Sequence, residues 1–214
     1  MKIQKLLHSC LLVEENGTRI LIDPGEYCFI EGLVIPEKLA PIDAILVTHS
    51  HADHCDTSAI KKINPKKIFG DSLTARKLEK EGIASHVSTV GQIISVGSFQ
   101  IQVIRAPHDQ RLSQPMPESL GFILNDKLLH PGDSLDFDTS HPYTVLALPI
   151  AAPWMVRREA LDLGVKLKPP HIIPIHDGNF KEFALKGTYE TAAGFFKPHG
   201  IQFHPLKPGE LLEL

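Results

Sequence analysis

The chain has 214 residues, of which 43% are hydrophobic and 22% charged, and this composition excludes disordered, collagen-like and membrane-embedded classes. We expect one domain over residues 1–214. A formal charge of -3 argues against a nucleic-acid-binding protein that neutralises phosphates broadly. Histidine is unusually frequent, with 12 His against three Tyr and one Trp, so the composition raises the question of metal ligation.

The N-terminal residues do not have the pattern of a targeting segment. His8 interrupts a short apolar run, and Glu14 and Glu15 follow it at once, whereas a signal segment needs roughly 7 to 15 apolar residues. The three cysteines form no CxxC pair and favour free thiols in a reducing compartment; they are Cys10, Cys28 and Cys55. We therefore expect a cytoplasmic protein that does not insert into a membrane.

The first half of the chain begins with a hairpin and continues with alternating strands and helices. Strands are predicted over residues 2–13 and 18–22, because an Asn-Gly turn between apolar runs is typical of a β-hairpin. A loop rich in proline and glycine over 24–41 leads to a buried strand over 43–48. The elements expected next are a helix over 56–63, a strand over 66–69 and a helix over 72–81.

The second half repeats this order. Strands are predicted within 86–105, and a long loop over 106–118 has the length of a functional lid. The elements that follow are a hairpin of 119–124 and 127–129, a strand over 143–148, a helix over 153–163, a strand over 171–175, a helix over 188–196 and two terminal strands. This order predicts an α/β fold of two packed sheets with helices outside, a four-layer αββα sandwich.

The strand over 43–48 runs directly into a cluster of metal-ligand residue types with the pattern HxHxDH. His49 and His51 alternate at the end of an extended strand and so project to one face, while Asp53 and His54 lie in the turn before the next helix. Imidazole and carboxylate groups suit zinc, manganese or iron, and the lack of a cysteine argues against a closed structural zinc site. The alternative is a polar helix cap with hydrogen-bonded core histidines.

Together with four further signals, this pattern resembles the metallo-β-lactamase superfamily over nearly the whole chain. The four signals are Asp23 in ILIDPG, His108 in IRAPHD, Asp133 in HPGDS and His176 in IIPIHDG. The first and last segments of the chain look most like the small single-domain lactonase-like hydrolases of that superfamily. The resemblance implies the same αββα sandwich and a site at the junctions between strands and loops.

By resemblance, the site would hold two divalent metal ions, zinc in the first place and manganese or iron otherwise. The implied ligands are His49, His51 and His108 for one ion, Asp53, His54 and His176 for the other, and Asp133 as the bridge between them. Asp23 would orient a ligand histidine by accepting its second N–H, with a turn-forming role as the alternative. His8 would lie near the site by the same analogy.

The chemistry implied by this site is hydrolysis of a small molecule. Two metals share a hydroxide that bridges them and polarise a substrate oxygen, and excess positive charge favours an anionic substrate or transition state. Asp53 would hold the hydroxide and pass a proton to the leaving group. We expect a metal-dependent hydrolase of a small ester, lactone or phosphoester. The alternatives are an iron-dependent oxidoreductase on the same scaffold and a phosphodiesterase or nuclease.

Several residues outside the ligand set also bear on the site. His130 precedes the GDS loop and could approach the metals, although it matches no ligand position. Arg111 and Trp154 could form walls of a substrate pocket, with ordinary surface and core positions as the alternative. The basic run over residues 61–67 favours a solvated face over a phosphate-binding one.

Overall fold

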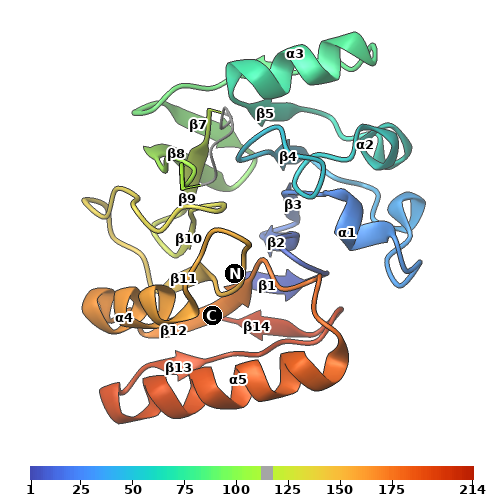
Figure 1. Ribbon diagram of the computed structural model, residues 1–214. Coiled ribbons are helices and arrows are strands. Elements are labelled where there is room, and N and C mark those ends of the chain that lie inside the picture. The colour runs from blue at the N-terminus through green and yellow to red at the C-terminus, as the bar shows by residue number, and fades with distance from the viewer. Residues whose placement is uncertain (112–117) are drawn as a thin grey trace.

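Two mixed β-sheets, each of seven strands, form the centre of the computed structural model, which describes residues 1–111 and 118–214 (Figure 1). The sheets lie face to face, and helices cover their outer faces. The expected four-layer αββα sandwich is therefore confirmed. None of the described helices is both long and apolar enough to cross a membrane.

The first sheet has the strand order β14-β1-β2-β3-β4-β5-β6. Its strands are β1 (Lys2–Lys5), β2 (Leu11–Glu15), β3 (Thr18–Ile22), β4 (Ala44–Leu46), β5 (Ile68–Gly70), β6 (His86–Val87) and β14 (Leu211–Glu213). β3, β4, β5 and β6 pair in parallel, so their carboxyl ends meet at one edge of the sheet. Asp23 follows β3 at this edge, and the HxHxDH segment follows β4.

The second sheet has the order β13-β12-β11-β10-β9-β8-β7. Its strands are β7 (Ile93–Val96), β8 (Phe99–Arg105), β9 (Leu120–Leu124), β10 (Leu128–His130), β11 (Val145–Pro149), β12 (His171–Ile175) and β13 (Gln202–Phe203). β8, β10 and β12 run in the same direction, and a ligand candidate follows each of them. His108, Asp133 and His176 therefore come to one edge of this sheet.

The helices are divided between the two outer faces (Figure 1). α1 (Glu26–Phe29), α2 (Thr57–Ile63) and α3 (Ser72–Lys80) follow strands of the first sheet, whereas α4 (Arg157–Leu167) and α5 (Glu182–Phe196) follow strands of the second. Aspartates cap two of them: Asp56 accepts from the Ala59 amide and Asp71 from the Leu73 amide. Single 3-10 turns lie at Pro36–Lys38 and Lys197–His199.

Three apolar clusters fill the three spaces between the four layers. Alternation along β2 shows how the sequence forms them: Leu11 and Val13 face the cluster between the sheets, whereas Leu12 faces the cluster under the helices. The third cluster joins the second sheet to α4 and α5 through side chains such as Leu161 and Phe196. The two rigid sheets thus carry the loops of the site on packed supports.

Several predicted boundaries were wrong. The strand expected over 2–13 is broken by a tight turn over 6–10, in which Leu6 donates to the Cys10 carbonyl and His8 takes a left-handed φ of 55°. The loop over 24–41 contains α1 and a 3-10 turn. The last two helices lie at Arg157–Leu167 and Glu182–Phe196, offset from the expected 153–163 and 188–196. The tip of the expected lid, 112–117, lies outside the described residues.

Candidate metal centre

Side chains from both sheets converge at the shared edge of the sandwich. They form two groups whose ligand atoms all lie within 4.8 Å of one another inside each group. The first group is His49, His51, His108 and Asp133, and the second is His8, Asp53, His54 and His176. All seven residues predicted as ligands are brought together, and His8 joins them from the turn between β1 and β2.

The first group has spacings that suit a tetrahedral metal. His49 Nε2 lies 3.1 Å from His51 Nδ1 and 3.8 Å from Asp133 Oδ2. His108 Nε2 lies 3.4 Å from the same Asp133 oxygen. Zinc bonds of about 2.0–2.1 Å in tetrahedral geometry place ligand atoms about 3.3 Å apart. One ion could therefore contact these atoms together.

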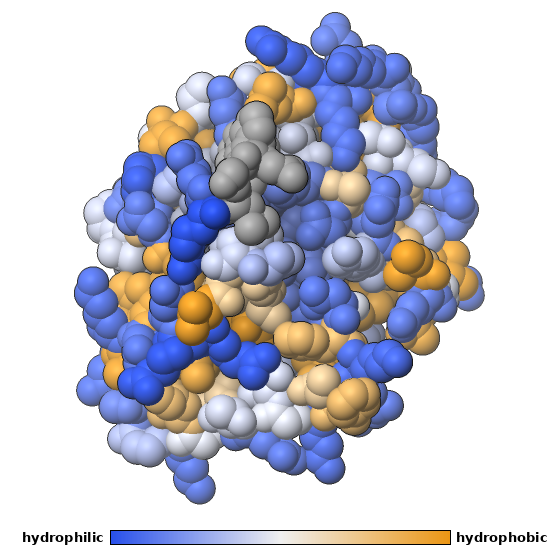
Figure 2. All heavy atoms as spheres, viewed as in Figure 1, coloured by the Kyte–Doolittle hydropathy of each residue, from blue (hydrophilic) through white to orange (hydrophobic). Residues whose placement is uncertain are grey.

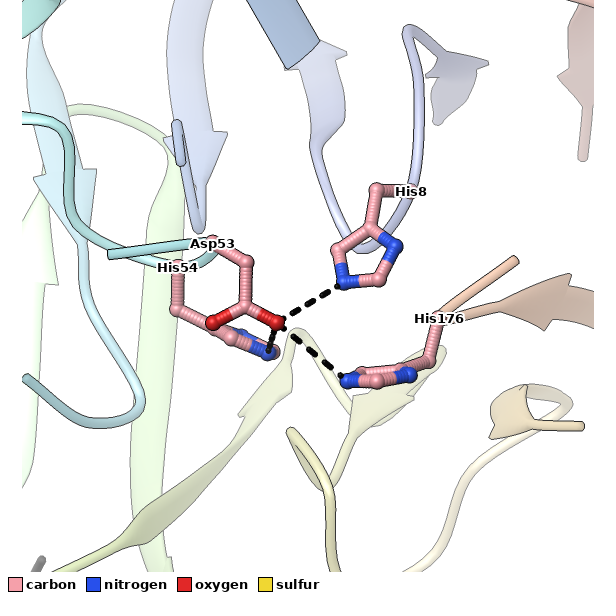
Figure 3. A group of neighbouring side chains, drawn as sticks. All are labelled: His8, Asp53, His54 and His176. Carbon is pink, nitrogen blue, oxygen red and sulfur yellow. Dashed lines mark hydrogen bonds and ion pairs between the residues drawn. The ribbon is translucent and has the colours of Figure 1, made fainter. Parts of the chain in front are cut away.

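The second group surrounds the Asp53 carboxylate (Figure 3). Asp53 Oδ2 lies 3.5 Å from His176 Nε2 and 3.9 Å from His54 Nε2. Asp133 also reaches this group, because its Oδ1 lies 2.9 Å from His54 Nε2 and its Oδ2 lies 3.2 Å from His176 Nε2. Asp133 thus lies between the two groups, in the position of a bridging ligand.

Five buried polar atoms at the centre face one another and make no hydrogen bond to the other described residues around them. They are Nε2 of His54, His108 and His176 and both carboxylate oxygens of Asp133. An unpaired buried polar atom costs about 1–3 kcal/mol, so such a cluster would destabilise the fold unless another group meets it. Imidazole nitrogens and carboxylate oxygens form the donor set of zinc, manganese or iron. The residues present therefore fit two divalent metal ions.

A hydrogen-bonded chain behind the site orients two of the histidines. Asp23 Oδ2 lies 2.8 Å from His54 Nδ1 and accepts the hydroxyl of Thr48 at 2.7 Å. The Thr48 oxygen in turn lies 3.0 Å from His49 Nδ1 and can accept its N–H. Both imidazoles are then left with a bare Nε2 that points into the site. Thr48 was not singled out in the sequence, although it immediately precedes the motif.

Backbone carbonyls orient two further histidines in the same way. His108 Nδ1 lies 2.9 Å from the Asp109 carbonyl and His176 Nδ1 lies 2.5 Å from the Ala151 carbonyl. A carbonyl only accepts, so each Nδ1 carries the proton and each Nε2 is free to bind a metal. Four imidazoles in the site therefore share one tautomer.

The local backbone explains how the motif segment is held. Pro24 accepts from the Asp56 amide at 3.0 Å, and a Cβ on Gly25 would overlap the backbone of Asp53, so the segment packs against a residue without a side chain. Lys77 donates to the carbonyls of Ser50 at 2.9 Å and Cys55 at 2.7 Å. These hydrogen bonds hold both ends of the turn that carries the ligand candidates.

Left-handed backbone conformations occur at three positions around the site. The φ angles are 55° at His8, 48° at Asp23 and 61° at His176. Residues with a Cβ adopt this region uncommonly, and such positions cluster at functional sites. Each of the three side chains is buried and directed toward the donor groups.

Charges in the metal-free site shift the pKa values of its members. Burial alone would lower the pKa of His176, but the Asp133 carboxylate prevails and raises it to about 10. The same carboxylate and Asp23 raise the pKa of His54 despite its burial. Burial lowers the pKa of His49, and the charge of His54 adds to this effect. The site therefore holds protons at the places where metal ions would bind.

A buried ionic network supports the segment that carries His176. Lys5 Nζ contacts Asp177 Oδ2 at 2.5 Å and the Pro174 carbonyl at 2.6 Å, and the Tyr189 hydroxyl donates to Asp177 at 2.6 Å. This network joins β1, the end of β12 and α5. It fixes the residue next to a ligand candidate and was not predicted from the sequence.

An open pocket lies beside one member of the first donor group. A cavity of about 660 Å³ lies beside His108, and Arg111 lines it while pairing with Asp109 at 2.7 Å. The Trp154 ring lies 4.6 Å from the His108 ring and 5.4 Å from the His176 ring, between centroids. Trp154 thus lies against two of the ligand candidates, and its role as a pocket wall stays a prediction.

An apolar surface borders the other side. The Tyr27 ring meets the His8 ring edge-on, with centroids 5.0 Å apart. Figure 2 shows apolar residues gathered over α1 and the segment that follows it, where Ile30 and Leu33 are 74% and 64% exposed. The rim of the site therefore combines aromatic and aliphatic side chains on this side.

Other residues considered in the sequence lie away from the donor groups. His130 is buried, and its Nε2 lies 2.9 Å from the Ser9 carbonyl while its Nδ1 accepts from the Gly132 amide. The lysines of the basic run are exposed, and three of them pair with carboxylates; these are Lys61, Lys62 and Lys66. The three cysteines are buried thiols. The remaining histidines are His86, His141, His171, His199 and His204, and neither donor group includes them.

The sequence profile of the beta-lactamase superfamily domain matches residues 2–176, and the chain belongs to this family. A UPF0173 metal-dependent hydrolase of Carboxydothermus hydrogenoformans is 28% identical, and the match covers 100% of each chain. This confirms the resemblance and the enzyme class, a metal-dependent hydrolase, that the sequence predicts.

Solved structures show how widely the fold is used. Igni18, a metallo hydrolase of Ignicoccus hospitalis, matches with a TM-score of 0.73 at 20% identity, and the match covers 100% of this chain and 98% of that one. CmlA, a diiron β-hydroxylase of Streptomyces venezuelae, matches with a TM-score of 0.72 at 15% identity over 100% of this chain and 54% of its own. At these identities the likeness concerns the fold alone.

Proposed function

We propose that the protein is a two-metal hydrolase that cleaves a small ester, lactone or phosphoester. One observation carries the proposal: two donor groups, each built from side chains of both sheets, meet at Asp133, whose two oxygens lie 2.9 Å from His54 Nε2 and 3.4 Å from His108 Nε2. When bound, a pair of divalent ions lowers the pKa of water to near 7 and polarises a carbonyl or phosphoryl oxygen.

Asp53 is the residue that we propose to handle the proton. Its side chain is 25% exposed, whereas those of Asp133 and Asp23 are 1% and 0% exposed. Asp53 is therefore the carboxylate that substrate and solvent can reach while its other contacts hold it in the site. A carboxylate in this position can accept a proton from the nucleophile and return it to the leaving group.

A small substrate is favoured by the shape and charge of the surroundings. The cavity of about 660 Å³ beside His108 has the size of pockets that bind small molecules. Arg105 and Arg111 line it, but each pairs with a carboxylate, Asp136 and Asp109 respectively, so they offer no free basic track for a nucleic acid. We therefore retain a small-molecule substrate, anionic ones included.

The test removes one ligand at a time and measures metal and turnover together. His176→Ala and Asp133→Ala are expected to lower bound metal and to abolish hydrolysis, while the fold is retained. The matched control is His199→Ala, which removes an exposed imidazole outside both donor groups. Full activity in either site variant would contradict the two-metal assignment.

A substrate panel and elemental analysis separate the alternatives. Lactones, thioesters, β-lactams and bis-p-nitrophenyl phosphate are compared with and without a chelator. Two zinc or manganese ions per chain with chelator-sensitive cleavage support the hydrolase. Iron with oxygen consumption would instead support an oxidoreductase, and preferred cleavage of the phosphodiester would support a phosphodiesterase or nuclease.

A further inference from the structure

His8 lies at the tip of the turn between β1 and β2 and points at the Asp53 carboxylate (Figure 3). Its Nε2 is 3.2 Å from Asp53 Oδ2, and its side chain is 1% exposed. Proximity alone groups it with Asp53, His54 and His176 as a metal-ligand candidate. Whether it binds a metal depends on which of its ring nitrogens carries the proton.

The second nitrogen of His8 faces a donor. The Gly178 amide donates to His8 Nδ1 at 3.1 Å, so this nitrogen must present its lone pair. A neutral imidazole carries a single N–H, which is then on Nε2. His8 Nε2 therefore donates to Asp53 and has no lone pair left for a metal ion.

The ligand histidines have the opposite arrangement. In His54, His108 and His176 the Nδ1 atom faces an oxygen acceptor, which leaves Nε2 bare. His8 differs from them in which ring nitrogen carries the proton, and this decides whether Nε2 can bind a metal ion. The contrast separates three imidazoles that can ligate through Nε2 from one that can only donate through it.

Contacts within the backbone hold His8 in this orientation. Its carbonyl accepts from the His176 amide at 3.3 Å, and this backbone hydrogen bond joins the turn to the segment after β12. A Cβ added to Gly178 would lie 2.9 Å from the His8 Cβ, so the close approach of the Gly178 amide requires glycine. Tyr27 covers the other edge of the ring. The His8 ring cannot rotate without losing these contacts.

We propose that His8 is a positioning residue that fixes the Asp53 carboxylate by donating its Nε2 proton, and that it is not a metal ligand. The inference rests on the proposed function, in which Asp53 handles the proton. Asp53 is the most exposed carboxylate of the site and needs a fixed donor to keep one rotamer. The two other histidines of the second donor group, His54 and His176, then keep their Nε2 lone pairs for a metal ion.

The first test reads the tautomer in the zinc-loaded protein and does not depend on any substrate. Long-range proton–nitrogen NMR of the ring is expected to show His8 protonated on Nε2, with His54 and His176 unprotonated on Nε2. A His8 Nε2 that lacks a proton and carries the nitrogen shift of a metal-bound imidazole would overturn the proposal. Because no turnover is measured, this result stands even if the substrate class proposed above is wrong.

The second test compares variants that keep or remove the donor. His8→Phe keeps a ring without a donor and is expected to lower kcat by about 10- to 100-fold, the range for such partners, with little change in KM and full metal content. His8→Gln can donate near the Nε2 position and is expected to recover part of the loss. Loss of one metal equivalent in both variants, or full activity in His8→Phe, would overturn the proposal.

A third variant covers the case in which the ring replacement does not fold. His8→Asn suits a left-handed backbone and is too short to reach Asp53. It is expected to match His8→Phe in kcat and in metal content, with melting temperature as the check on folding. An Asn variant as active as the parent would contradict the donor role.

Discussion

Asp23 connects two histidines that belong to different donor groups. It accepts from His54 directly and from His49 through the Thr48 hydroxyl. Its carboxylate also accepts the Thr48 amide at 2.7 Å. One buried side chain therefore fixes the tautomers of two ring systems, so its effect on metal binding is expected to exceed that of a single contact.

Asp23→Asn is expected to weaken metal binding by about 10- to 100-fold. The amide nitrogen of the new Asn would face at least one of the N–H and O–H donors that the Asp23 carboxylate now accepts from. Competition with a chromophoric chelator measures the change. The control is Asp162→Asn, which alters an exposed carboxylate paired only along α4 with Arg158. Equal affinities in the two variants would show that Asp23 does not orient the ligands.

Protons and metal ions are expected to compete at His54 and His176. Asp133 raises the pKa of His176 to about 10 despite its burial, and Asp133 and Asp23 raise the pKa of His54, so both rings hold a proton more tightly than a free imidazole and must lose it to ligate. Metal binding should then release protons, and affinity should rise with pH near neutrality, by at least about 10-fold per pH unit from His176 alone. Calorimetry of zinc binding in buffers of different ionisation enthalpy measures the release; buffer-independent heats would contradict it.

The ligand candidates could be predicted because they lie in the segments that follow strands in the sequence. Thr48 and Gly178 were not, since their importance depends on distances between segments that lie far apart in the chain. His130 is the converse case, in which the sequence position suggested a role that the contacts in the structure do not support. Its place before the GDS loop suggested contact with the metals, but its ring is used to hold Ser9.

At the scale of elements, the turn after β3 and the motif segment after β4 pack as one unit. The Glu26 amide donates to the Ala52 carbonyl at 2.8 Å, and Gly25 leaves room for Asp53. Two loops from neighbouring parallel strands are therefore joined through their backbones. Their spacing sets the position of the ligands that both proposed metals need.

Gly25→Ala is expected to displace the Asp53 backbone and to lower kcat by at least about 10-fold, because small displacements of reacting groups have large effects on rate. Steady-state kinetics and metal analysis measure the change. Gly187→Ala is the matched control, since this helical glycine has nothing within 4 Å of the added Cβ and should gain about 0.5–1 kcal/mol of stability. An unimpaired Gly25 variant would show that the contact does not position Asp53.

Sequence patterns located most elements but misplaced the ends of several. Apolar alternation predicted β8, because a half-buried strand must alternate, whereas β3 was predicted by the Asn-Gly turn before it. The break between β1 and β2 was missed because residues 2–13 were predicted as one strand across His8. Only the tertiary contacts of His8 require a turn there.

At the scale of the whole molecule, the two sheets are joined at both edges. The two donor groups lie at one edge. A polar cluster of Glu15, Asn125 and Lys127, the Glu15 cluster, lies at the other. Glu15 is the last residue of β2 and accepts from Lys127 and Asn125, both at 2.6 Å, in the turn between β9 and β10. The Lys127 ammonium holds the pKa of Glu15 below its ordinary value despite partial burial.

The Glu15 cluster is expected to add stability only above the ordinary pKa of a glutamate. A carboxylate with a lowered folded-state pKa stabilises the fold above its unfolded value of 4.5, and the contribution disappears as pH falls through the lower folded value. Glu15→Gln should therefore lose up to about 1 kcal/mol at pH 7 and much less near pH 3. Urea unfolding of the metal-free protein measures both, with exposed Glu31→Gln as control; a pH-independent difference would refute the prediction.

The left-handed residues His8, Asp23 and His176 have a consequence for how quickly the site fills. Each left-handed residue costs conformational energy of order 1 kcal/mol, and the packing of the two sheets offsets this cost during folding. The incoming ion then finds its ligands already arranged and has few rotamers to freeze. Capture should be limited by the release of water and protons, with little change in amide hydrogen exchange between the empty and loaded protein.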